Sequence, residues 1–89
     1  MPDKKEKYLL ASIVGPDRSG LIAEITSTIA DFGYSIEDMD QVVMHGVFVF
    51  SLMINISHGQ ENLESLKKKL EHRCRELGLE VVFYYPDGK

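Results

Sequence analysis

A short run with the residue types to bind a charged small molecule joins a predicted strand to a predicted helix: Gly15-Pro16-Asp17-Arg18-Ser19-Gly20-Leu21-Ile22. The first backbone N–H groups of a helix lack intrahelical partners and lie at the positive end of the helix dipole, so they favour a carboxylate. Gly20 has no side chain to keep a ligand away, and Asp17 offers a carboxylate to an ammonium group. These groups match the two charges of an α-amino acid. In the other interpretation, Asp17 or Ser19 only caps the helix and Gly20 only eases packing.

Two motifs imitate catalytic sites without completing them. The same run has the glycine spacing of a P-loop, but Leu21 and Ile22 stand where that loop needs Lys and Ser or Thr. The pair Asp38 and Asp40 matches the Asp-x-Asp signature of haloacid-dehalogenase phosphatases. Those enzymes need an apolar buried strand before the nucleophile and a surrounding α/β domain, whereas 35–37 reads Ser-Ile-Glu and few residues follow. We therefore predict that the two acids protect an exposed strand edge.

The remaining candidate ligands are too dispersed to predict a metal centre. His45, His58 and His72 lie far apart in the sequence. Cys74 is the single cysteine, which excludes an intrachain disulfide and a site of several thiolates. It falls on the apolar stripe of a predicted helix, so we expect a buried thiol. The sequence predicts no metal, no catalytic residue and no cofactor.

Size and charge exclude several classes of function. The chain has 89 residues, of which 44% are hydrophobic and 27% charged, as expected of one small folded domain spanning 1–89. A formal net charge of −4 argues against nucleic-acid binding, which needs a basic surface. The sequence offers neither the apolar stretch of a signal peptide nor the roughly 20 apolar residues that span a bilayer, so we expect a cytoplasmic protein with no membrane partner. A domain of this size has a marginal core, which favours association.

Hydrophobic periodicity predicts six elements in the order β-α-β-β-α-β. Gly33 is placed to end the first helix, and His45-Gly46 to form a two-residue hairpin. The predicted strands cover 8–14, 34–44, 47–56 and 79–85, and the predicted helices cover about 21–32 and 59–77. Two right-handed crossovers joined by a hairpin give an α+β fold of the ferredoxin-like βαββαβ type. In this sandwich, two helices cover one face of a four-stranded antiparallel sheet.

The sheet face without helices is predicted to be about half apolar. Its predicted members are Tyr8, Leu10, Ser12, Val14, Val47, Val49, Ser51, Met53, Asn55, Glu80, Val82 and Tyr84. A sheet face that is exposed to water normally carries mostly polar residues. Because this face is about half apolar, we expect it to contact another subunit or domain. Scattered exposed aliphatic side chains are the alternative.

The turn motif, Gly33 and the element order resemble the ACT family, in which a Gly-x-Asp-x-x-Gly-Leu/Ile turn opens the first helix. The resemblance covers about 7–85, and the stretch 36–46 is similar to the first ACT domain of microbial phosphoserine phosphatases. It implies a regulatory domain that binds an amino acid, with serine as the suggested ligand. It also implies a homodimer or pairing with another ACT domain. The ligand-binding residues that it implies are Asp17, Arg18, Ser19, Gly20, Leu21, Ile22 and Gln41.

A ligand-free, ACT-like dimerisation module is the main alternative, because it uses the same fold and the same apolar face. A third possibility is a small ferredoxin-like enzyme such as an acylphosphatase. That activity needs an Arg in a phosphate-cradling loop and an Asn for water, and Arg18 with Asn55 is too little support. In the regulatory interpretation, catalysis belongs to a parent or partner enzyme outside 1–89.

We predict that the isolated chain has no phosphatase activity, with or without magnesium, because Asp38 and Asp40 lack the rest of a site. Release of phosphate from phosphoserine is the measurement. Turnover that disappears in Asp38→Asn would contradict the regulatory interpretation.

Overall fold

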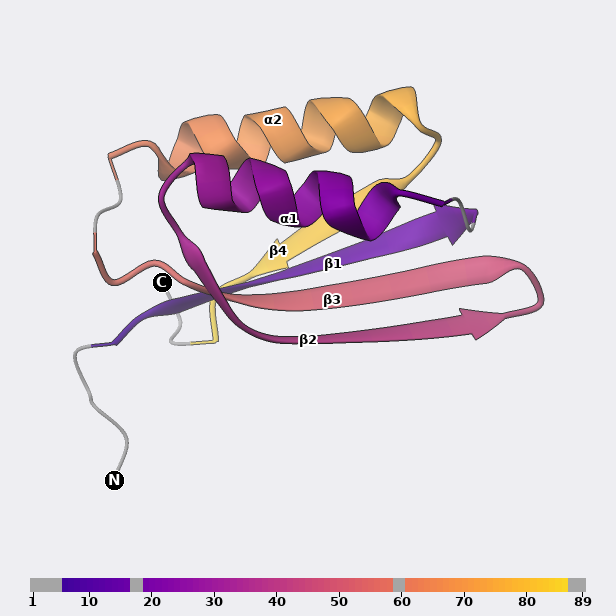
Figure 1. Ribbon diagram of the computed structural model, residues 1–89, viewed down its shortest axis with the longest axis horizontal. Helices are drawn as coiled ribbons and strands as arrows, with labels where there is room; N and C mark the ends of the chain where they lie inside the picture. The colour runs from indigo at the N-terminus through magenta and orange to yellow at the C-terminus, as the bar shows by residue number, and fades with distance from the viewer. Residues whose placement is uncertain (1–5, 17–18, 59–60, 87–89) are drawn as a thin grey trace.

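The chain folds into the six predicted elements in a computed structural model that describes residues 6–16, 19–58 and 61–86 (Figure 1). The elements are β1 (Tyr8–Pro16), α1 (Leu21–Asp31), β2 (Ser35–Met44), β3 (Val47–Asn55), α2 (Leu63–Glu76) and β4 (Glu80–Tyr84). The strands pair antiparallel in the order β2-β3-β1-β4, and both helices lie on one face of the sheet (Figure 1). The predicted ferredoxin-like α+β fold is thereby confirmed.

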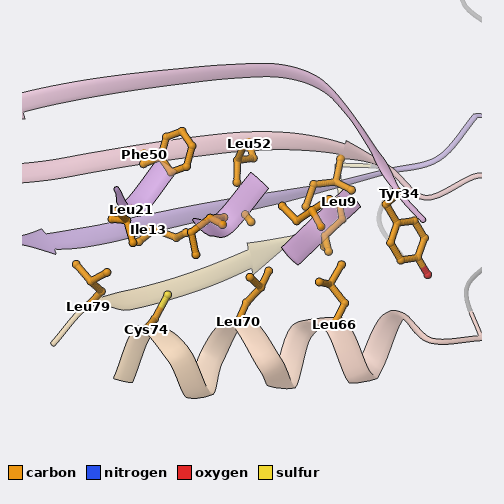
Figure 2. Close-up of a cluster of buried hydrophobic side chains, with 14 of the residues drawn as sticks. Leu9, Ile13, Leu21, Tyr34, Phe50, Leu52, Leu66, Leu70, Cys74 and Leu79 are labelled. Atoms are coloured by element: carbon orange, nitrogen blue, oxygen red, sulfur yellow. The ribbon is translucent and has the colours of Figure 1, made fainter. Parts of the chain in front are cut away.

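Buried and more exposed side chains alternate along the two central strands, β1 and β3. The buried ones form the core between the sheet and the helices (Figure 2). β1 and β3 are paired from Tyr8 opposite Asn55 to Pro16 opposite Val47, which brings their buried side chains onto the helix side. The fully buried side chains include Leu9, Ile13, Ile25, Ile29, Phe50, Leu52, Ile54, Leu66, Leu70 and Cys74. Burial raises the pKa of the Cys74 thiol, as expected of a core cysteine. Neither helix, among the residues described, is long and apolar enough to cross a membrane.

Two element boundaries differ from the prediction for identifiable reasons. β1 continues through Gly15 to Pro16, because a proline at the end of a strand costs no interior ladder hydrogen bond. α2 begins at Leu63 rather than near 59. Asn62, the residue before it, accepts a hydrogen bond from the Tyr34 hydroxyl (2.6 Å) and donates to the Phe32 carbonyl (3.2 Å). This contact joins the end of α1 to the start of α2.

The β2–β3 hairpin extends beyond the helices (Figure 1). His45 (φ 52°) and Gly46 (φ 80°) both have left-handed backbone conformations, which confirms the predicted two-residue turn. Because no helix covers this end of the sheet, Val43 and Met44 on opposite faces are both more than half exposed.

A β-bulge at Glu37 moves the side chains that follow it in β2 to the opposite faces of the sheet. The sequence pattern does not indicate this bulge. Ile36 pairs with Ile54, but Asp38 pairs with the next residue back, Met53. A strict period of two from Ile36 would turn residue 41 away from the helices. The extra residue turns Gln41 toward the helix side instead.

Gly15 is required by packing rather than by its dihedral angles. A Cβ at this position would overlap the Leu79 side chain, and it would lie 3.1 Å from Leu79 Cα and 3.3 Å from the Gly78 carbonyl oxygen. Leu79 is itself buried. The first glycine of the turn motif therefore allows the start of β4 to approach β1 closely.

We expect Gly15→Ala to lower the free energy of unfolding by about 1–3 kcal/mol, the range for overpacking a core. Urea denaturation of Gly15→Ala, Leu79→Ala and the double variant measures the coupling between the two positions. The double variant should lose less free energy of unfolding than the two single variants lose together, because the smaller side chain at position 79 makes room for the new methyl group. Strict additivity would contradict the proposed contact.

Candidate functional site

A hollow of about 480 Å³ lies between the start of α1 and the part of the β2–β3 hairpin that carries Gln41 and Phe48. The described residues that line it are Ser19, Gly20, Leu21, Ile22, Ala23, Gln41 and Phe48. The fold thus brings together all five sequence-predicted site residues that it describes. The two others, Asp17 and Arg18, lie outside the described residues. Ala23 and Phe48 were missed, since neither residue type carries a binding signal in the sequence.

Of the two predicted capping residues, the structure tests Ser19 alone, because Asp17 lies outside the described residues. Gly20, not Ser19, is the N-cap residue, and its backbone is left-handed with φ 80°. The N-cap therefore supplies no side-chain oxygen to the first turn of α1. A Cβ at Gly20 would meet nothing within 4 Å, so the position is open on the side where a side chain would stand. Gly20 therefore precedes the helix and is not part of it, because its φ is not helical.

The first turn of α1 provides backbone donors to the hollow. The first intrahelical hydrogen bond runs from the Glu24 N–H to the Gly20 carbonyl (3.0 Å). The N–H groups of Leu21, Ile22 and Ala23 precede that bond and have no acceptor four residues earlier within the helix. All three residues line the hollow. Donors at a helix N-terminus favour an anionic group such as a carboxylate.

Gln41 approaches this turn from the edge strand. It pairs with Phe50 in β3, on the helix side of the sheet, and it is exposed. It also lines an adjoining hollow of about 330 Å³ with Ile22, Met39, Asp40 and Phe50. Gln41 and Ile22 therefore border both spaces. A side-chain amide can both donate and accept hydrogen bonds, which suits it to a polar ligand.

Both aspartates of the Asp-x-Asp pair accept hydrogen bonds from the backbone of β2, an edge strand of the sheet. Asp38 Oδ1 accepts a hydrogen bond from the Met39 N–H and Asp40 Oδ1 accepts one from the Gln41 N–H, each at 2.9 Å. These bonds occupy two backbone donors of an edge strand. That the two acids protect this edge stays a prediction. In the part of the chain that the structure describes, no group of three or more His, Cys, Asp or Glu is placed to hold a metal ion.

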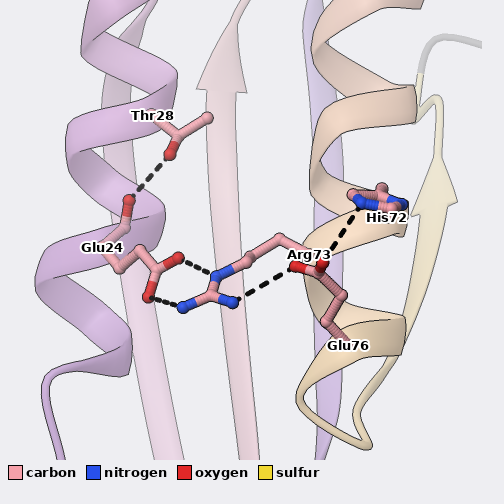
Figure 3. A network of polar contacts seen from close by, with 5 residues as sticks. All are labelled: Glu24, Thr28, His72, Arg73 and Glu76. Atoms are coloured by element: carbon pink, nitrogen blue, oxygen red, sulfur yellow. Dashed lines mark hydrogen bonds and ion pairs between the residues drawn. The ribbon is translucent and has the colours of Figure 1, made fainter.

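A further hollow, of about 330 Å³, lies between the two helices. Four of the charged side chains that line it, Glu24, His72, Arg73 and Glu76, interact with one another. Arg73 on α2 donates two hydrogen bonds to the carboxylate of Glu24 on α1 and one to Glu76 at 3.2 Å (Figure 3). The hydrogen bonds that Arg73 donates to Glu24 and, to a lesser extent, to Glu76 raise the pKa of Arg73. His72 lies 3.3 Å from Glu76. Because the guanidinium is already paired with two carboxylates, Arg73 joins the helices and is a poor ligand for a further anion.

Comparisons with known proteins give a matching family model, similar curated proteins and similar folds. A family model described as ACT domain matches residues 7–84. A UPF0237 protein of Methanocaldococcus jannaschii is 32% identical over 79 residues, which cover 89% of this chain and 88% of that protein. The structure of an ACT domain protein from Streptococcus pneumoniae matches with a TM-score of 0.75 and 23% identity, over 89% of each chain. The ACT domain from GTP pyrophosphokinase of Chlorobium tepidum matches with a TM-score of 0.64 and 27% identity, over 89% of this chain and 99% of that one.

We predict that Gly20→Ala destabilises the fold by about 1 kcal/mol, because a Cβ disfavours the left-handed conformation. Gly20→Asn should cost less, since Asn tolerates this conformation better than Ala. Urea denaturation of the two variants measures the difference. An Ala variant as stable as wild type would contradict the left-handed N-cap.

Proposed function

The chain belongs to the ACT domain family of small-molecule-binding regulatory modules, and we propose that it binds an amino acid at the turn between β1 and α1. Binding regulates a partner or parent enzyme, and the domain itself carries out no catalysis. The observation that carries the proposal is the hollow in which the start of α1 meets Gln41.

The chemistry of the hollow supports an α-amino acid. The carboxylate takes the N–H groups of Leu21, Ile22 and Ala23 at the start of α1, where the helix dipole adds to the hydrogen bonds. Gln41 binds a polar group from the side of β2. Asp17 supplies the negative charge for the ammonium group, as proposed from the sequence. A volume of about 480 Å³ lies in the range of small-molecule sites, about 300–1,000 Å³.

Serine is the proposed ligand, and the similarity of 36–46 to phosphoserine phosphatases is its only support. The family is consistent with an amino acid but does not select one. The domain from GTP pyrophosphokinase has the same fold, and the proposal of a regulated enzyme does not require that it be a phosphatase.

Regulation requires that the ligand prefer one state of the domain over another. We infer that the two states differ in association with a second copy or with another ACT domain. Such coupling is reciprocal, so association must tighten or weaken ligand binding by the same factor. A ligand-free dimerisation module is the second candidate. The exposed apolar residues of the sheet favour it as much as they favour a ligand-binding domain that associates.

We expect calorimetric titration of the wild-type chain with the twenty amino acids to show binding of serine or a related amino acid. Gln41→Ala should weaken binding about tenfold, equivalent to about 1.4 kcal/mol, the loss of one hydrogen bond. Asp17→Asn should weaken it more, because a hydrogen bond to a charged group contributes about 1.5–3 kcal/mol.

The matched control is Ser65→Ala, an exposed residue of α2 away from the hollow, which should bind as wild type does. If no amino acid binds wild type at millimolar concentration, the dimerisation module is the better account. Equal loss in Ser65→Ala and Gln41→Ala would place the ligand elsewhere.

A further inference from the structure

The sheet face opposite the helices remains uncovered in the folded domain and is largely apolar. Six large hydrophobic residues on it are more than a third exposed: Val14, Val42, Met44, Val47, Val82 and Tyr84. The face also carries Asp38, Asp40 and Glu80, and no Lys or Arg among the described residues of its strands. An exposed apolar surface with a polar rim marks an interaction site.

Strand pairing orders this face into three rows that run across all four strands. From β2 to β4, the rows are Val42-Val49-Val14-Glu80, Asp40-Ser51-Ser12-Val82 and Asp38-Met53-Leu10-Tyr84. The two central columns are apolar except for one serine pair, whose hydroxyl oxygens are 3.2 Å apart. The acids occupy only the outer columns, two on β2 and one on β4.

A second copy fits this pattern in one orientation. A two-fold axis parallel to the strands lays β2 of each copy over β4 of the other. Val49 then faces Val14, Met53 faces Leu10, and the serines face serines. Asp38 faces the partner's Tyr84, whose hydroxyl can donate to a carboxylate. An axis perpendicular to the strands would instead lay β2 over β2 and gather the acids of both copies at one edge, which like-charge repulsion disfavours.

The available area is sufficient for a specific contact. Strands about 4.8 Å apart, rising about 3.4 Å per residue, give this face a plan area of roughly 500 Å². Two copies would bury about 1,000 Å² in total, the lower bound for a specific interface. The β2 edge is a poorer route to association, because Asp38 and Asp40 occupy two of its backbone donors.

We propose that the helix-free face packs against the same face of a second copy, as two stacked sheets with β2 over β4. This deepens the regulatory proposal by naming the association that the ligand would shift. The ligand hollow lies on the helix side of the sheet, so it remains open when the two faces pack.

Sedimentation velocity at roughly 100 μM tests the proposal, since association depends on protein concentration. Val49→Lys places a charge opposite the partner's Val14 and should halve the mass of the wild-type species. Val82→Lys is the matched variant, because it places the same charge opposite the partner's Asp40 and should keep the wild-type mass. Met53→Lys, which faces Leu10, should dissociate like Val49→Lys. Circular dichroism checks that each variant is folded.

An unchanged mass in Val49→Lys and Met53→Lys would overturn the proposal, whether wild type is a monomer or a dimer. Dissociation of Val82→Lys to the same extent as Val49→Lys would overturn the β2-over-β4 arrangement. Calorimetry separates this result from the ligand proposal. Folded, dissociated Val49→Lys should still bind the amino acid that wild type binds, whereas failure of wild type to bind any amino acid would leave the mass result standing.

Discussion

The antiparallel pairing of β1 with β3 is the constraint on which the rest of the structure depends. It runs the full length of both strands and assigns every second residue of each to the helix side. The apolar stripes of the two helices pack on that side of the sheet, and together they form the core. The same pairing fixes where β1 ends, and hence where the turn into α1 lies. Gly15, near the end of β1, lets Leu79 approach closely, so one contact joins the residues before this turn to the start of β4.

The site depends on this frame and on one irregularity in it. The bulge at Glu37 turns Gln41 toward α1 and turns Asp38 and Asp40 toward the open face. Without the extra residue, the hollow would lose its polar side chain from β2 and the helix side would gain two acids. Asn55, the one polar residue that is buried among those described, donates to Glu37 (3.3 Å) and accepts from the Ser57 N–H (2.9 Å). These contacts hold the bulge in place from the neighbouring strand.

The sequence predicts most of the fold, because periodicity and turn chemistry are local signals. Phe48, Phe50, Leu52 and Ile54 alternate over a whole strand, and His45-Gly46 has the residues that a tight hairpin needs. The motif at 15–22 predicts where the candidate site lies, but the sequence does not predict the geometry of that site. Glycine permits a left-handed φ without requiring it, so the residue type alone does not predict the conformation of Gly20. The bulge at Glu37 depends on how β2 pairs with β3, and an isolated strand does not encode that. The role of Gly15 was hidden for the same reason, since Leu79 lies far along the chain.

The central claim is that an amino acid binds where the first N–H groups of α1 meet Gln41. Amide chemical shifts in a ¹⁵N-labelled chain titrated with serine and other amino acids test it most directly. The account predicts saturable shifts of the backbone N–H groups of Leu21, Ile22 and Ala23 and of the Gln41 side-chain amide. It predicts little change around Arg73 in the hollow between the helices. Shifts confined to that second hollow, or no shifts with any amino acid, would contradict it.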